Sequence, residues 1–258
     1  MTQPTVPETL LARPRAGLVA VTLVLPLACW IWVVAMARDM YGPMSGASAW
    51  MMTVTWDWPR LLLLWAMWAA MMAAMMLPTM TPALLLYARV MRRRGDEAAA
   101  VARINLMAAG YVLVWALFSV GATALQRALS NTSVLTTMME PASPRVAAVL
   151  LLIAAAYQWT PLKTACLHHC RSPIALFTTG WREGQSGAFR MGVEQGVYCL
   201  GCCWALMLLL FAGGVMNLAV ILALTAWVAI EKVAPFGQQS ARVSGALLAA
   251  MAIWLLVR

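Results

Sequence analysis

The sequence predicts an all-α fold, namely a polytopic bundle of transmembrane helices. Hydrophobic residues make up 63% of its 258 positions and charged residues only 10%, whereas a soluble domain carries about 25% charged residues. The mean hydropathy is +0.79, and apolar runs of about 20 residues, the length that spans a bilayer, recur along the chain. The lipid bilayer is therefore the first predicted partner.

Seven apolar runs are long enough, or nearly long enough, to cross a membrane. They cover residues 17–37, 61–91, 104–129, 146–170, 192–212, 215–230 and 241–257. The last two runs are short, and Ala212-Gly213-Gly214 predicts a hairpin or a kink, so six helices is the alternative count. Residues 1–16 are mostly polar with three prolines and predict a disordered cytoplasmic tail. Residues 17–258 predict a single transmembrane domain.

The basic residues predict how the bundle is oriented. They gather before the first run and in the even-numbered connections: Arg13, Arg15, Arg89, Arg92, Arg93, Arg94, Lys163, Arg171, Arg182, Arg190 and Lys232. Positive charge stays on the cytoplasmic side of a membrane, so the amino terminus is predicted to be cytoplasmic. The net charge of +9 follows from this pattern, and no basic patch with interleaved aromatic residues predicts a nucleic-acid partner.

The second run is rich in methionine and contains two prolines. Met72, Met76 and Met80 recur at every fourth position and so share one helix face. Pro78 and Pro82 cannot donate a backbone hydrogen bond, and the carbonyls that they free must find another partner at membrane depth. Thioethers select Cu(I), although methionine is also a flexible filler of apolar cores. This methionine face indicates a metal site only if other metal-binding side chains lie next to it in the fold.

Cysteine and histidine form two clusters. Cys199, Cys202 and Cys203 lie three and four residues apart, which places three thiols on one side of a helix. Cys166, His169 and Cys170 share a face near the end of the fourth run, with His168 pointing elsewhere. Thiols and imidazoles bind copper or zinc. The alternative is that the cysteines pack as small hydrophobes and that the histidines lie among lipid headgroups.

Few other ionisable residues fall within the apolar runs, where a charge is costly and often functional. Glu194 lies five residues before Cys199, and we predict that it ligates a hard ion, pairs with a cation or accepts a proton. Glu231 and Lys232 are expected to form an interfacial pair. The segment 172–189 is expected to be an interfacial or re-entrant loop. The predicted topology puts the methionines and both cysteine clusters on the cytoplasmic side of the bilayer.

Four segments resemble the family of predicted metal-binding integral membrane proteins described as DUF2182. They are Trp68–Pro82 (WAAMMAAMMLPTMTP), Cys166–Pro173 (CLHHCRSP), Glu194–Met207 (EQGVYCLGCCWALM) and Glu231–Gly237 (EKVAPFG). The resemblance runs from the second helix to the last. It implies an all-helical protein of the bacterial cytoplasmic membrane with a metal site, and it supplies no agreed activity.

The favoured function is Cu(I) handling, as a carrier, transporter or delivery factor. The proposed ligands are Cys166, Cys170, Cys199, Cys202 and Cys203, with His169 and then His168 next, and with Met72, Met76 and Met80 as a relay for metal that enters or leaves. A metallochaperone or a metal-accepting protein is the implied partner, and the oligomeric state is not predicted.

Three alternatives stay open. One is a membrane metalloenzyme that holds copper, iron or zinc, with Glu194 as the proton-handling group. Another is a thiol–disulfide relay between Cys166/Cys170 and Cys199/Cys202. The last is a structural zinc ion that joins two helices.

Overall fold

The computed structural model describes residues 17–42, 44, 46, 49, 56–94, 97–136, 138–172, 180–234 and 236–257, without the side chains of residues 97 and 98. In these ranges the chain is helical and holds no β-strand, apart from one isolated bridge between Leu135 and Pro141. The predicted all-α class is therefore confirmed. The predicted tail, residues 1–16, lies outside the described residues.

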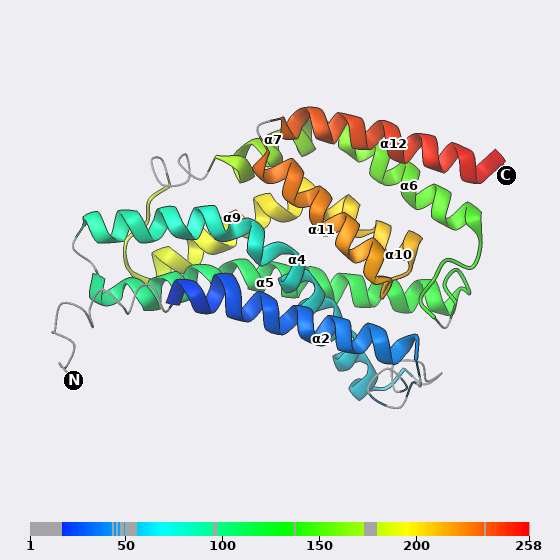
Figure 1. Ribbon diagram of the computed structural model, residues 1–258, viewed down its shortest axis with the longest axis horizontal. Coiled ribbons are helices and arrows are strands. Elements are labelled where there is room, and N and C mark those ends of the chain that lie inside the picture. Colours follow the sequence, from blue (N-terminus) through cyan, green and yellow to red (C-terminus); the bar gives the residue numbers. More distant parts are fainter. Residues whose placement is uncertain are drawn as a thin grey trace, which may run out of the picture.

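The helices lie mostly along one long axis (Figure 1). A π-helical turn, η1, leads into the first α-helix. The elements are η1 (Ala20–Val24), α2 (Leu25–Met40), α4 (Trp58–Arg93), α5 (Glu97–Asn131), α6 (Pro144–Gln158), α7 (Pro161–Arg171), α9 (Gly184–Met207), α10 (Leu209–Gly213), α11 (Leu218–Val233) and α12 (Gly237–Val257). The sequence predicts a loop over residues 172–189, and this prediction is wrong for residues 184–189, which form the first turns of α9. Residues 173–179 lie outside the described part of the chain.

All seven predicted runs fall in helices, but not every run is a span. Over the described residues, five helices are long and apolar enough to cross a membrane, and α6 with α7 makes a sixth if a pair bent by 68° counts as one span. The bend falls just before Pro161, the first residue of α7, where the Thr160 side chain accepts a hydrogen bond from the Lys163 amide at 3.2 Å. Helix α11 has 16 residues, about 24 Å at 1.5 Å per residue. The alternative count of six therefore agrees better with the helix lengths.

At Pro78, the first of the two prolines inside helix α4, a neighbouring helix replaces the lost donor. Pro78 leaves the Ala74 carbonyl without its usual backbone partner. The indole Nε1 of Trp30, on α2, donates to that carbonyl at 3.1 Å. This contact is the kind of compensation that a proline in a membrane helix requires, and it joins α2 to the methionine-rich part of α4.

Helices α5 and α9 approach each other so closely that only glycine fits between them. A Cβ atom at Gly192 would overlap the Met107 carbonyl, and one at Gly110 would overlap the Phe189 carbonyl. Small residues allow helix backbones to touch in this way. Gly196 packs against the Val114 side chain in the same seam. The close approach brings the middle of α5 beside the cysteines of α9.

Candidate metal centre

Cys199 lies at the centre of a buried polar cluster between α4, α5, α9 and α11. Its Sγ lies 2.8 Å from the hydroxyl oxygen of Tyr111 on α5 and 2.9 Å from Nζ of Lys232 on α11. All three residues are buried. A thiol within hydrogen-bond reach of an ammonium group is stabilised in its thiolate form, the form that binds metals.

Lys232 directs its three N–H groups at the cluster. Its Nζ donates to Cys199 Sγ, to Thr79 Oγ1 at 3.4 Å and to the Met76 Sδ at 3.6 Å. A lysine ammonium has three donors and no acceptor, so the three partners satisfy it as a cation. Met76 is thereby placed beside the same ammonium as Cys199. The Tyr111 hydroxyl lies 3.1 Å from the Met76 carbonyl and 2.8 Å from Cys199 Sγ, and its one O–H is free to donate to the sulfur when Cys199 is a thiolate.

The other thiols gather around Cys199. Cys202 and Cys203 donate to the Cys199 carbonyl, with sulfur–oxygen distances of 3.1 and 2.9 Å. The Cys170 thiol, from α7, lies near the thiols of both Cys199 and Cys202. The Gln195 amide, one turn before Cys199 on α9, donates to the Cys170 carbonyl at 3.5 Å. The structure thus brings together Cys170, Cys199, Cys202, Cys203 and Met76, here called the thiol cluster.

Cys166 and the two histidines lie at the edge of this cluster. A Cβ atom at Gly201 would lie 2.7 Å from Cys166 Sγ, so this thiol fits against α9 only because residue 201 is glycine. His169 is exposed and stacks on Tyr198 with ring centroids 4.5 Å apart. His168 is exposed as well. Neither imidazole faces the thiol cluster.

The other residues predicted to belong to the site, Met72, Met80 and Glu194, differ in how they lie relative to the thiol cluster. Met72 and Met80 are buried on α4 on either side of Met76. Glu194 is half-buried on α9, and within the part of the chain that the structure describes it makes no contact with the thiol cluster. Gln195, not Glu194, lies one helical turn from Cys199, because residues four apart share a helix face.

Glu231 and Lys232 are not the interfacial pair expected from the sequence, because both are buried and contact different neighbours. Lys163 Nζ lies 2.6 Å from Glu231 Oε2, with side chains 1% and 2% exposed. The other carboxylate oxygen accepts hydrogen bonds from Gln158, Ser244 and Trp227 at 3.0, 3.2 and 3.0 Å. A buried carboxylate needs a cation and hydrogen bonds to its remaining lone pairs, and Glu231 has both.

Sequence reasoning missed Tyr111, Thr79 and the true partner of Lys232. The available signal was Lys232 itself, a cation close to the end of an apolar run, because ionisable residues within a membrane are functional by default. Tyr111 carried no such signal. Its role depends on the glycine seam between α5 and α9, which is a tertiary contact.

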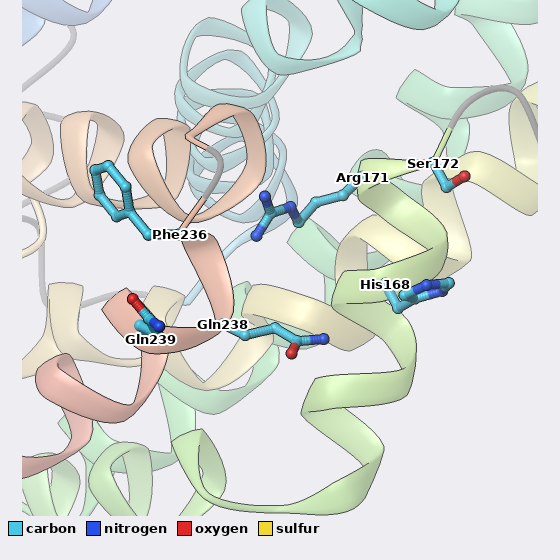
Figure 2. A pocket seen from close by; sticks show the side chains of 6 residues that line it. All are labelled: His168, Arg171, Ser172, Phe236, Gln238 and Gln239. Carbon is cyan, nitrogen blue, oxygen red and sulfur yellow. The ribbon is translucent and has the colours of Figure 1, made fainter.

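An open cleft lies between the end of α7 and the start of α12. It has a volume of about 580 Å³ and is lined by His168, Arg171, Ser172, Phe236, Gln238 and Gln239. Figure 2 shows Arg171 extending from α7 toward the connection between α11 and α12, where its guanidinium donates to the Ala234 carbonyl. The exposed side chain of His168 lines this cleft.

The donor set of the thiol cluster is soft. It offers thiols and a thioether, whereas hard cations prefer oxygen ligands. Among the described residues, no three His, Cys, Asp or Glu side chains are spaced as in a formed metal site, and the thiols of Cys202 and Cys203 are turned toward a carbonyl. A thiol must lose its proton to bind a metal, so binding would replace these S–H hydrogen bonds.

The fold and the cluster define a class: a multi-pass helical membrane protein with a buried group of soft sulfur donors. A family model described as "PpoB2: Copper chaperone" matches residues 65–255, which is more than half of the chain. The chain therefore belongs to this copper chaperone family. No curated protein and no solved structure matches it. That the chain also belongs to DUF2182 by name stays a prediction.

Proposed function

We propose that this protein carries Cu(I) within the membrane and passes it to an acceptor protein, and that the metal binds the thiol cluster. The observation that supports this most is that Cys170 on α7 reaches Cys199 and Cys202 on α9. Met76 on α4 lies against the same Lys232 ammonium as Cys199. Three helices thus contribute sulfur to one buried place.

Cu(I) suits this donor set better than zinc or iron does. Structural zinc sites take four ligands from Cys and His in a tetrahedron, whereas here the thiols of Cys202 and Cys203 are turned toward a carbonyl and the thioether of Met76 lies beside the same ammonium as Cys199. Catalytic iron and copper commonly use imidazole. Thiolates and thioethers select Cu(I), and the copper chaperone family agrees with that choice.

A route to and from the cluster follows from the same residues. Met72 and Met80 flank Met76 on α4 and supply further thioethers along the core. Cys166, His168 and His169 lie between the cluster and the surface at α7, where a metallochaperone or a metal acceptor would make first contact. We place this end on the cytoplasmic side of a bacterial membrane, with the amino terminus cytoplasmic, because basic residues flank it.

Metal analysis of the purified protein tests the proposal. Wild-type protein, purified anaerobically in detergent, is expected to bind about one Cu(I) in competition with a colourless Cu(I) chelator. Its X-ray absorption spectrum should show sulfur neighbours. The Cys199→Ser/Cys202→Ser variant should lose this binding, and the matched Cys29→Ser variant should keep it, since Cys29 lies on α2 outside the cluster. Wild-type protein that takes up no copper on reconstitution would contradict the proposal.

One observation favours a second candidate, a thiol–disulfide relay. Cys170 and Cys199 come from different helices and their thiols lie near each other, and an ammonium 2.9 Å from Cys199 Sγ, that of Lys232, favours the nucleophilic thiolate. A relay predicts a Cys170–Cys199 disulfide that forms and is reduced during turnover in membranes. A copper carrier predicts instead that this disulfide abolishes metal binding and that the functional protein keeps all its thiols reduced.

A further inference from the structure

We propose that Cu(I) leaves the thiol cluster along a row of sulfur atoms between α4 and α9, toward the amino-terminal end of α4, and that an aromatic pair, Trp68 and Phe211, closes the far end of this row. The inference rests on the proposed function of the cluster as a copper site. It adds a direction to that function, from the cysteines near α7 to the side of the membrane predicted to be external.

The first support is a line of residues on α9 that continues from the thiol cluster into α10. Its members recur at every fourth position, and residues four apart share a helix face. In order they are Cys199, Cys203, Met207 and, after a short break at Leu208, Phe211. All four members of the line are at most 1% exposed. Three sulfur atoms therefore follow one another along this face, and an aromatic ring ends it.

Helix α4 carries a second line with the same spacing: Met76, Met72 and Trp68. Contacts at both ends show that the two lines face each other. At one end, the Met76 Sδ and the Cys199 Sγ lie 3.6 and 2.9 Å from the ammonium nitrogen of Lys232. At the other end, the ring centroids of Trp68 and Phe211 lie 5.1 Å apart. The residues between these contacts therefore lie between the same helices.

The residues between the two contacts supply the sulfur atoms of the path. They are Met72 on α4 and Cys203 and Met207 on α9, and with Met76 and Cys199 they are here called the sulfur row. Successive members on one helix are one turn apart, about 5–6 Å between Cβ atoms. Methionine is unbranched and flexible, so one sulfur atom can pass a cation to the next without a water-filled channel.

Thioethers suit this passage through a membrane core. A cation is costly in that environment, and soft donors that select Cu(I) offset part of the cost at each step. A thioether has no proton to lose. Transfer of Cu(I) from Met72 to Met207 therefore changes only which sulfur atoms bind the ion, and neither a proton nor an electron moves with it.

The aromatic pair at the end of the row acts as a stop. Trp68 is fully buried, and its indole Nε1 donates a hydrogen bond to Gln126 Oε1 at 2.7 Å. That hydrogen bond holds the indole against the Phe211 ring, across the end of the sulfur row. The next residue outward on the same face of α4 is Leu64, which is buried and has no sulfur. Movement of one ring is therefore the step that opens the row.

Transport into liposomes tests the path. The liposomes enclose a membrane-impermeant Cu(I) chelator, whose colour reports the Cu(I) that enters. We expect wild-type protein to admit Cu(I) faster than protein-free liposomes do. Met207→Leu should slow entry about tenfold, because a lost ligand raises the barrier for transfer. It should keep the Cu(I) affinity of the thiol cluster and the melting temperature, since exchange of methionine for leucine nearly conserves volume.

Met91→Leu is the matched control. Met91 is also fully buried, but it lies near the opposite end of α4, away from the sulfur row, so this variant should admit Cu(I) at the wild-type rate. Phe211→Leu, with folding checked by thermal unfolding, removes the ring and should raise the rate without changing Cu(I) affinity.

The outcomes separate the path from the copper site. Equal rates for Met207→Leu and wild type would overturn the path, and so would wild-type protein that binds Cu(I) but admits none. A rate for folded Phe211→Leu that does not exceed the wild-type rate would overturn the role of the aromatic pair. Wild-type protein that binds no Cu(I) would contradict the proposed function itself.

Discussion

Lys163 and Glu231 form an ion pair in the core of the bundle, with Nζ and Oε2 2.6 Å apart and both side chains almost fully buried. The pair joins the start of α7 to the end of α11. It therefore holds in place the two helices that carry Cys170 and Lys232 to the thiol cluster.

Breaking this pair on one side should be more damaging than removing both partners. Lys163→Met leaves the Glu231 carboxylate buried without its cation, and loss of one partner of a buried pair costs about 3–5 kcal/mol. The double variant Lys163→Met/Glu231→Gln should recover much of that stability. Thermal unfolding in detergent measures both effects. A double variant less stable than Lys163→Met would show that the carboxylate is held by its other hydrogen bonds instead.

The Tyr111 hydroxyl should strengthen metal binding at Cys199. It lies 2.8 Å from the sulfur, and a hydrogen bond to a charged group contributes about 1.5–3 kcal/mol. From this energy we expect Tyr111→Phe to weaken Cu(I) binding roughly tenfold or more. Competition with a Cu(I) chelator measures the affinity. Tyr198→Phe is the matched control, because that tyrosine stacks on His169 outside the cluster and its loss of a hydroxyl should leave Cu(I) affinity unchanged.

The glycine seam between α5 and α9 should tolerate no added methyl group. Gly192→Ala forces the helices apart, since its Cβ would overlap the Met107 carbonyl, and overpacking costs about 1–3 kcal/mol. It should also weaken Cu(I) binding, because α5 carries Tyr111. Gly121→Ala, also on α5, adds a methyl group where nothing lies within 4 Å. That variant should match wild type in melting temperature and in copper affinity, and equal behaviour of the two variants would refute the steric role of the seam.

The hydrogen bond from Trp30 to the Ala74 carbonyl should matter only while Pro78 is present. Trp30→Phe removes the 3.1 Å hydrogen bond and leaves the carbonyl unsatisfied, at a cost of about 1–3 kcal/mol. In a Pro78→Ala background the backbone N–H returns to that carbonyl, and Trp30→Phe should then cost much less. A four-variant cycle of unfolding measurements checks this. Equal costs in both backgrounds would mean that Trp30 acts through packing alone.

Much of the fold could be predicted because its signals are local. Apolar runs of membrane length predicted the helices, and the i, i+3 and i+4 spacings predicted that Cys199, Cys202 and Cys203 share one side of α9. The number of spans was harder to predict. Composition continues smoothly through residues 146–170, whereas the chain bends by 68° between α6 and α7.

The candidate site was only partly predictable, because its polar members come from separate helices. The sequence singled out Glu194, whereas the structure puts its neighbour Gln195 beside Cys170. Glu231 and Lys232 are neighbours in sequence and were expected to pair with each other. They lie about 100° apart around a helix, so each meets a different part of the core.

By itself, the sequence determined that this protein is a helical membrane bundle rich in soft sulfur ligands, because hydrophobic length and helical periodicity are properties of single segments. Only the tertiary structure decided which sulfur atoms meet, and that Lys232 and Tyr111 meet them. Those contacts depend on how closely the glycines let α5 and α9 approach, and on the side of α11 that each charge occupies. Such relations exist only once helices distant in sequence have packed.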